Sequence, residues 1–88
     1  MKTPKINSHE GTVLSGGQKI EGRYANYFEI GHNAFEFVLD FGQYFPETDQ
    51  AKLYTRIITS PCYAKELSET LQESIGRYEE IFGIIKEA

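Results

Sequence analysis

Alternating apolar and polar residues mark three short segments after residue 23, namely Tyr24–Ile30, Phe35–Phe41 and Ala51–Thr59. Successive side chains of a strand point to opposite faces, so a period of two with aromatic and β-branched residues predicts β-strands. The intervening segment Gly42–Gln50 is predicted to be a loop, because Pro46 cannot donate a hydrogen bond within a central strand. The pattern therefore predicts an antiparallel three-stranded meander.

The first two strands are predicted to pair through a tight turn. Asparagine tolerates the left-handed backbone of such turns, which favours a turn centred on residues 32 and 33. This turn places Ile30 opposite Phe35 and Phe28 opposite Phe37. A slip of one residue would scatter the apolar side chains over both faces of the sheet, so we expect this register to be strongly specified.

The period then changes to three or four residues, which is typical of a helix with one apolar face. Ser60 can accept hydrogen bonds from the first helical amides, and Pro61 suits the first helical position, where its missing N–H is not needed. Gly83 is predicted to end the helix, which therefore covers residues 61–82. Its apolar stripe comprises Ala64, Leu67, Leu71, Ile75, Tyr78 and Phe82.

Domain organisation follows from a change in composition near residue 22. Residues 1–22 contain several glycines and serines and are predicted to form a mobile tail, with a short added strand near Thr12–Leu14 as an alternative. Residues 23–88 are predicted to form a single domain. We expect the α+β class: an antiparallel meander of three strands, or four if the tail pairs, with one long C-terminal helix packed on one face.

The chain has 88 residues, one cysteine and a net charge of −4. A domain of this size buries only about two-thirds of its unfolded surface and is often marginally stable alone. Cys62 has no partner for an internal disulfide and is interpreted as unreactive. With no signal peptide or membrane span in the pattern, we expect a cytoplasmic protein that binds no membrane.

The charge is unevenly distributed. The first 23 residues carry four basic and two acidic side chains, whereas the rest of the chain carries five basic and eleven acidic ones. An acidic folded domain repels the phosphates of nucleic acids, so we expect no nucleic-acid partner.

Two short motifs have the letters of nucleotide-binding signatures. Leu14–Gln18 matches the signature of ABC-type ATPases, and Asp40–Gly42 matches the magnesium motif of kinases. Neither is accompanied by the phosphate-binding loop that those enzymes need, so the first is interpreted as a chance match and the second as a strand ending at a glycine. His9 and His32 have no second ligand at metal spacing. We expect no cofactor, no metal and no catalytic residue.

A charged cluster is the one arrangement with potential for acid–base chemistry. In the predicted register Glu29 lies opposite Glu36, and Arg56 follows on the same face one strand away. Two facing carboxylates could act as an acid–base pair if one had a raised pKa. The alternative is that Arg56 bridges them in a structural salt-bridge cluster, which we favour because the sequence offers no nucleophile beside it.

The second face of the predicted sheet carries four apolar or aromatic side chains among charges. One helix can cover only one face, so this second set is either an exposed patch or an interface. We predict an interface. Its members are Tyr27, Val38, Tyr54 and Ile58.

Three segments together carry a resemblance to a known family. They are EFVLDFG at residues 36–42, SPxxAKxL at residues 60–67 and YExxFG at residues 78–83. The chain resembles a small bacterial and archaeal family catalogued as a domain of unknown function, over about residues 24–83. The resemblance implies a stand-alone cytoplasmic protein of about this size and transfers no activity. The tail with Leu14–Gln18 lies outside it.

The sequence predicts a binding function that involves no chemical reaction. We expect a non-enzymatic, homo-oligomeric interaction or adaptor module, whose partner is a second copy of itself or another protein. One alternative is a chaperone-like binder of extended polypeptide, by analogy of fold with export chaperones. The other is an enzyme that uses the cluster of Glu29, Glu36 and Arg56.

Overall fold

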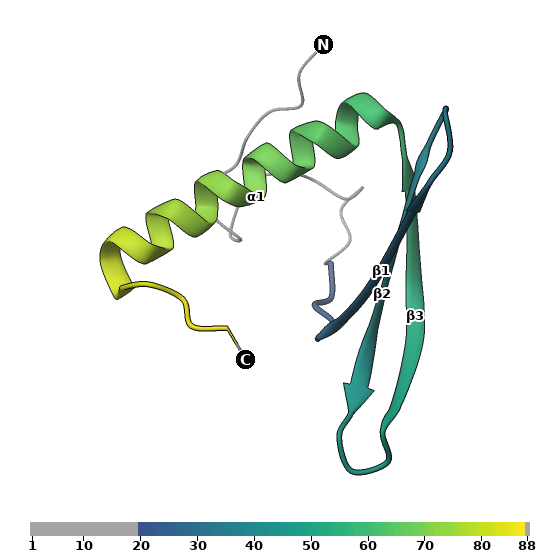
Figure 1. The fold of residues 1–88 in the computed structure, drawn as a ribbon, viewed down its shortest axis with the longest axis horizontal. Helices are drawn as coiled ribbons and strands as arrows, with labels where there is room; N and C mark the ends of the chain where they lie inside the picture. The colour runs from purple at the N-terminus through teal and green to yellow at the C-terminus, as the bar shows by residue number, and fades with distance from the viewer. Residues whose placement is uncertain (1–19, 88) are drawn as a thin grey trace. The chain divides into compact units, whose positions relative to one another are not determined.

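The computed structural model describes residues 20–87, which contain three strands and one helix (Figure 1). The strands form an antiparallel sheet in the order β1-β2-β3, so the α+β class predicted from the sequence is confirmed. The alternative fourth strand near Thr12–Leu14 lies outside the described residues. The elements are β1 (Tyr27–His32), β2 (Phe37–Phe45), β3 (Gln50–Thr59) and α1 (Pro61–Phe82).

The described residues fall into two units, the sheet up to Pro61 and the helix with its C-terminal segment from Cys62. Packing of the helix on one face of the sheet stays a prediction.

The register predicted for the first hairpin is wrong by four residues. Ile30 lies opposite Leu39, and Phe28 lies opposite Phe41. Because the displacement is an even number of residues, each side chain stays on its predicted face of the sheet. Phe35 is the exception, since it lies in the loop and is 84% exposed.

A hydrogen-bonded loop at Asn33–Glu36 explains the displacement. The Asn33 side-chain oxygen Oδ1 accepts hydrogen bonds from the N–H groups of Phe35 (2.8 Å) and Glu36 (3.0 Å). The Asn33 N–H donates to the Glu36 carbonyl at 3.0 Å. This asparagine-centred turn moves the hairpin tip beyond residue 33. Each residue of the first strand therefore pairs with a residue further along the second strand than it would across a two-residue turn.

The connection in the second hairpin is shorter than predicted. The prediction of a loop over residues 42–50 is wrong, because both ends of this segment belong to strands. Strand β2 continues to Phe45, and the connection to β3 is the four-residue turn Pro46–Asp49. Asp49 adopts a left-handed backbone with φ of 51°, which aspartate tolerates better than most residues. The Tyr44 hydroxyl donates to Asp49 Oδ1 at 2.7 Å, and this hydrogen bond raises the pKa of Tyr44.

A β-bulge interrupts the pairing of β2 with β3. Phe41 lies opposite Thr55 and Gly42 opposite Leu53, so Tyr54 is the extra residue. A Cβ atom at Gly42 would collide with the carbonyl oxygen of Lys52, which only glycine can avoid. The bulge also places Leu53 on the face of its partner Gly42, whereas strict alternation along Ala51–Thr59 would place it on the face of Thr55 and Ile57.

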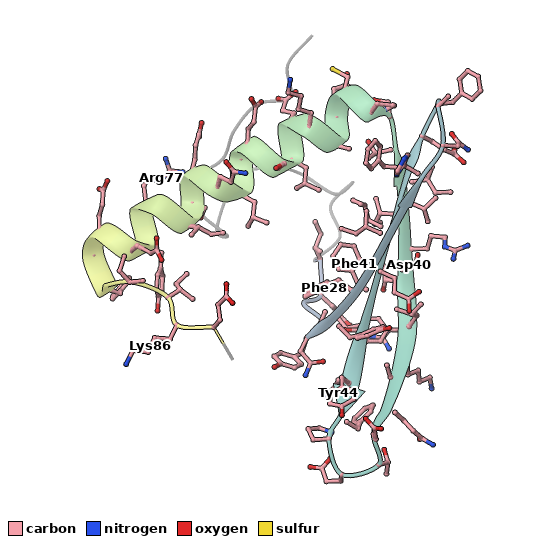
Figure 2. The ribbon with its side chains drawn as sticks, viewed as in Figure 1. Phe28, Asp40, Phe41, Tyr44, Arg77 and Lys86 are labelled. Atoms are coloured by element: carbon pink, nitrogen blue, oxygen red, sulfur yellow. The ribbon has the colours of Figure 1, made fainter. Side chains whose placement is uncertain are left out.

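The apolar face of the sheet holds the best-buried hydrophobic side chain among the described residues, Leu39, which is 7% exposed. Beside it the Phe28 and Phe41 rings meet edge to face, with centroids 5.8 Å apart. Figure 2 shows these two rings on one side of the sheet and Asp40 on the other. We call this set the apolar face: Phe28, Ile30, Phe37, Leu39, Phe41 and Ile57.

The amide of Asn26 extends the pairing of β2 beyond the start of β1. Its Oδ1 accepts from the Tyr44 N–H at 2.7 Å, and its Nδ2 donates to the Tyr44 carbonyl at 3.4 Å. The side chain thus replaces one residue of a neighbouring strand, and it satisfies backbone groups that β1 is too short to reach.

Helix α1 begins and ends where the sequence predicts. Pro61 is its first residue and Phe82 its last. Gly83 follows with φ of 95°, and its N–H donates to the Glu79 carbonyl at 2.9 Å. A left-handed glycine with this hydrogen bond is a common helix end, because it satisfies a carbonyl that has no partner inside the helix.

The bulge generates the first prediction. Gly42→Ala should lower the free energy of unfolding by roughly 1–3 kcal/mol, because the new methyl group collides with the backbone of β3. Urea denaturation followed by circular dichroism would measure the loss. Gly22→Ala is the matched control, since a Cβ at Gly22 meets no atom within 4 Å and Gly22 lies outside the strands, so this change should leave stability unchanged or raised. Equal midpoints for the two variants would contradict the steric explanation.

The helix start generates the second prediction. Ser60 directly precedes Pro61, the first helical residue, so Ser60→Ala should cost roughly 1 kcal/mol through the loss of an N-terminal cap. Ser74→Ala, in the middle of the same helix, is the control, and alanine should be neutral or favourable there. A denaturation midpoint unchanged by Ser60→Ala would show that Ser60 does not cap the helix.

Candidate functional site

The face of the sheet opposite the apolar face combines charged, aromatic and aliphatic side chains. Strand alternation and the observed register place three rows of side chains on this face, and each row runs across the three strands. We call this set the mixed face: Tyr27, Glu29, Val38, Asp40, Arg56 and Ile58.

A row of three charges crosses the middle of the mixed face. Glu29 lies opposite Asp40, and Asp40 lies opposite Arg56. The guanidinium of Arg56 contacts Asp40 through two parallel hydrogen bonds, Nε to Oδ1 at 2.8 Å and the terminal NH2 to Oδ2 at 2.9 Å. The Asp40 side chain is 10% exposed whereas that of Arg56 is 65% exposed, so the acceptor of this pair is nearly buried and the donor is accessible to solvent.

This ion pair fixes the ionisation of both groups. The hydrogen bonds from Arg56 hold the pKa of the Asp40 carboxyl below its ordinary value, although burial acts in the opposite direction. The same contact raises the pKa of Arg56. A carboxylate with a lowered pKa and both oxygens engaged is poorly suited to transfer protons near neutral pH, where general acids and bases need a pKa close to the working pH.

Glu29 is held by its neighbour on the same strand. The Tyr27 hydroxyl donates to Glu29 Oε2 at 2.7 Å, and this hydrogen bond raises the pKa of Tyr27. The carboxylate of Glu29 therefore stays on the mixed face next to Asp40. Two like charges are adjacent in the row, and the guanidinium on the far side of Asp40 offsets one of them.

The predicted cluster needs one correction, because Glu36 does not lie opposite Glu29. Glu36 closes the hairpin loop, where its N–H bonds to the Asn33 side chain. Asp40 takes its place in the row. The sequence contained a signal for it: residues 36, 38 and 40 share a face by alternation, so a carboxylate at either position 36 or 40 could have faced Arg56.

The four predicted interface residues differ in accessibility. Ile58 is 58% exposed and lies opposite half-buried Val38 on the mixed face. Tyr27 is half-buried on the same face. Tyr54, the bulge residue, is covered within its own chain, because the Arg23 guanidinium lies 3.6 Å from its ring centroid and its hydroxyl donates to the Tyr24 carbonyl.

A shallow hollow of about 410 Å³ lies on the mixed face near the tip of the first hairpin. Its lining includes Glu29, Gly31, Val38, Asp40 and Arg56. Gly31 leaves open space here, since a Cβ at this position would meet no atom within 4 Å. The hollow therefore has open space above Gly31 and a rim that carries the charges of Glu29, Asp40 and Arg56.

The remaining predicted chemical residues are not brought together. The Asp40–Gly42 segment lies within β2, which continues past the glycine instead of ending there. His32 stacks on Phe37 with ring centroids 5.4 Å apart, and Cys62 is an exposed free thiol. His9 and the Leu14–Gln18 motif lie outside the described residues. Within residues 20–87, no three His, Cys, Asp or Glu side chains gather in a way that could bind a metal ion.

These observations define a small α+β protein whose candidate site is the mixed face of its sheet. The chain belongs to the family described as protein of unknown function (DUF3467), whose model matches residues 2–87. The match extends beyond residues 24–83 and includes the N-terminal segment, which the resemblance carried by the three sequence motifs leaves out.

No curated protein and no solved structure matches the chain. In the described part of the chain, helix α1 lacks the combination of length and apolar character that a membrane-spanning helix requires.

The ion pair generates the third prediction. Because the pKa of Asp40 is lower in the folded state than in the unfolded chain, its contribution to stability is complete above the ordinary carboxyl pKa and is lost as pH falls through the folded-state value. Asp40→Asn should therefore flatten the decline in unfolding free energy between about pH 5 and pH 2. Urea denaturation across this range would measure it. Glu47→Gln, in an exposed turn, is the control and should keep the wild-type slope.

Proposed function

We propose that this protein is a non-enzymatic interaction module that forms homo-oligomers through the mixed face of its sheet. The observation that carries the proposal is an excess of apolar surface over what the described elements can cover. The sheet bears apolar side chains on both faces, and α1 bears a single apolar stripe. Such a stripe can cover at most one face, whichever face it is.

The uncovered surface is large for a chain of this size. Ile58 on the mixed face, Phe28 on the apolar face and Leu71 on the helix stripe are all more than half exposed. Burying one such side chain fully contributes about 1.5–3 kcal/mol. A few of them therefore equal the whole stability of a small domain, about 5–15 kcal/mol. Association of identical chains recovers this free energy, and two-fold symmetry is the commonest arrangement.

The geometry of the charged row supports a binding role over a catalytic one. Arg56 engages Asp40 with two hydrogen bonds, and Glu36 lies away from Glu29 at the hairpin loop. Glu29 still faces a carboxylate, that of Asp40, but both oxygens of Asp40 accept from Arg56, which leaves this carboxylate poorly suited to carry a proton. The row instead offers an exposed guanidinium and an exposed carboxylate at its two ends, which suits recognition of a complementary surface.

A second candidate function, binding of extended polypeptide, is favoured by the edge of the sheet. Strand β3 has ten residues, and no other described strand lies beyond it. An edge strand presents unpaired backbone N–H and carbonyl groups that can pair with an added strand. A monomeric wild type that slows the aggregation of an unfolded test protein would favour this candidate over the homo-oligomer.

The proposed function generates the fourth prediction. Light scattering and sedimentation velocity at micromolar concentration should report a dimer or larger assembly for the wild type. Ile58→Asp should dissociate it and lower its melting temperature together, because a charge replaces an apolar side chain of the interface. Thr48→Asp adds the same charge to an exposed turn and should change neither property. A monomeric wild type would contradict the proposal.

A further inference from the structure

We infer that the mixed face binds the mixed face of a second copy around a two-fold axis that runs parallel to β2. This inference rests on the proposed function and goes further by naming the symmetry and the residues that meet. It follows from the charges at the two ends of one row and the volumes at the two ends of another, which the same axis makes complementary, whereas the central Asp40 of each copy, bonded to its own Arg56, faces the partner's Asp40.

The charged row runs straight across the sheet, with Glu29 on β1, Asp40 on β2 and Arg56 on β3. An axis above the face and parallel to β2 turns the second sheet over and places β1 against the partner's β3. Glu29 of each copy then faces Arg56 of the other, twice in the dimer. An axis perpendicular to the strands through this row would instead place Glu29 on Glu29 and Arg56 on Arg56, which like charges oppose.

The hydrogen-bonding groups at the two ends of the row fit this pairing. A guanidinium has five N–H donors, and two of those of Arg56 reach Asp40 among the described residues. Glu29 accepts from Tyr27 through Oε2, so Oε1 can accept from the partner. Packed sheets lie about 10 Å apart, a span that an arginine and a glutamate can bridge from opposite faces. Each guanidinium would then lie between its own Asp40 and the partner's Glu29.

The neighbouring row has complementary volumes. Gly31 lies opposite Val38, and Val38 lies opposite Ile58, so the smallest residue is at one end and an exposed isoleucine at the other. The axis that pairs Glu29 with Arg56 also places each Ile58 over the partner's Gly31. The shallow hollow above Gly31 is open to receive it, since no atom lies within 4 Å of a Cβ at this position.

The steric test fills the hollow. Gly31→Leu should leave the monomer folded, because its own chain has room for the side chain, and should raise the dissociation constant about tenfold or more, because the partner's Ile58 is displaced at both ends. Gly22→Leu is the matched control, since a Cβ there also meets no atom within 4 Å and Gly22 lies outside the strands. Sedimentation equilibrium measures association, and circular dichroism measures folding.

The charge test uses mixing. E29R and R56E should each fail to self-associate, since each variant has the same charge at both ends of its row. An equimolar mixture should instead form a heterodimer in which both contacts join opposite charges. Native mass spectrometry separates the three species. Should R56E not fold without its bond to Asp40, the double variant E29R/R56E serves instead: it moves the guanidinium to the β1 side of Asp40, and it should dimerise where E29R does not.

The outcomes separate the two proposals. Dissociation by Gly31→Leu with association restored by charge exchange supports the inference. A dimeric wild type that Gly31→Leu leaves dimeric overturns the inference and keeps the homo-oligomer. A wild type that stays monomeric at micromolar concentration overturns both.

Discussion

The structure depends on the position of β2, the strand that is hydrogen-bonded on both sides. Three of its residues are buried, and each imposes a different requirement. Leu39 contributes to the apolar core on one face of the sheet. Asp40 lies on the other face and requires a cation beside it there. Gly42 lies so close to the backbone of β3 that no side chain fits between them. A buried carboxylate without a partner is costly, so Arg56 must lie beside Asp40, and this fixes the register of β3.

The helix could be predicted from the sequence, and so could the faces of the strands apart from Leu53 at the bulge and Phe35 in the loop, because local patterns determine them. Pro61, Phe82 and Gly83 bound the helix through the fixed backbone of proline and the left-handed freedom of glycine. The register could not be predicted. It depends on the Asn33 side chain, whose hydrogen bonds select a four-residue loop over a two-residue turn. Since both turns keep the same faces, the apolar pattern cannot distinguish them.

The residues of the candidate site could likewise be predicted from alternation, whereas their partners across the strands could not. Alternation assigned Tyr27, Glu29, Val38, Arg56 and Ile58 to one face, and the register confirms that they share it. Two features escaped. Asp40 replaced Glu36 because the displaced register changed which carboxylate meets Arg56. Tyr54 lies at a bulge, and the contacts that cover it come from Arg23 and Tyr24. Both precede β1, which begins at Tyr27 and not at Tyr24 as the alternating pattern predicts.

Folding of one chain also orders the mixed face, through which we propose that the protein associates. The two hydrogen bonds to Asp40 hold the Arg56 guanidinium in one orientation before any partner arrives, and Tyr27 does the same for Glu29. Side chains ordered in advance lose less conformational entropy on binding. In the proposed dimer Asp40 therefore links stability to association, whereas Gly31 and Glu29 lie on the face without supporting the fold beneath it. In the proposed dimer, changes at Gly31 and Glu29 would weaken association without disturbing the fold of a single chain, whereas changes at Asp40 would disturb both.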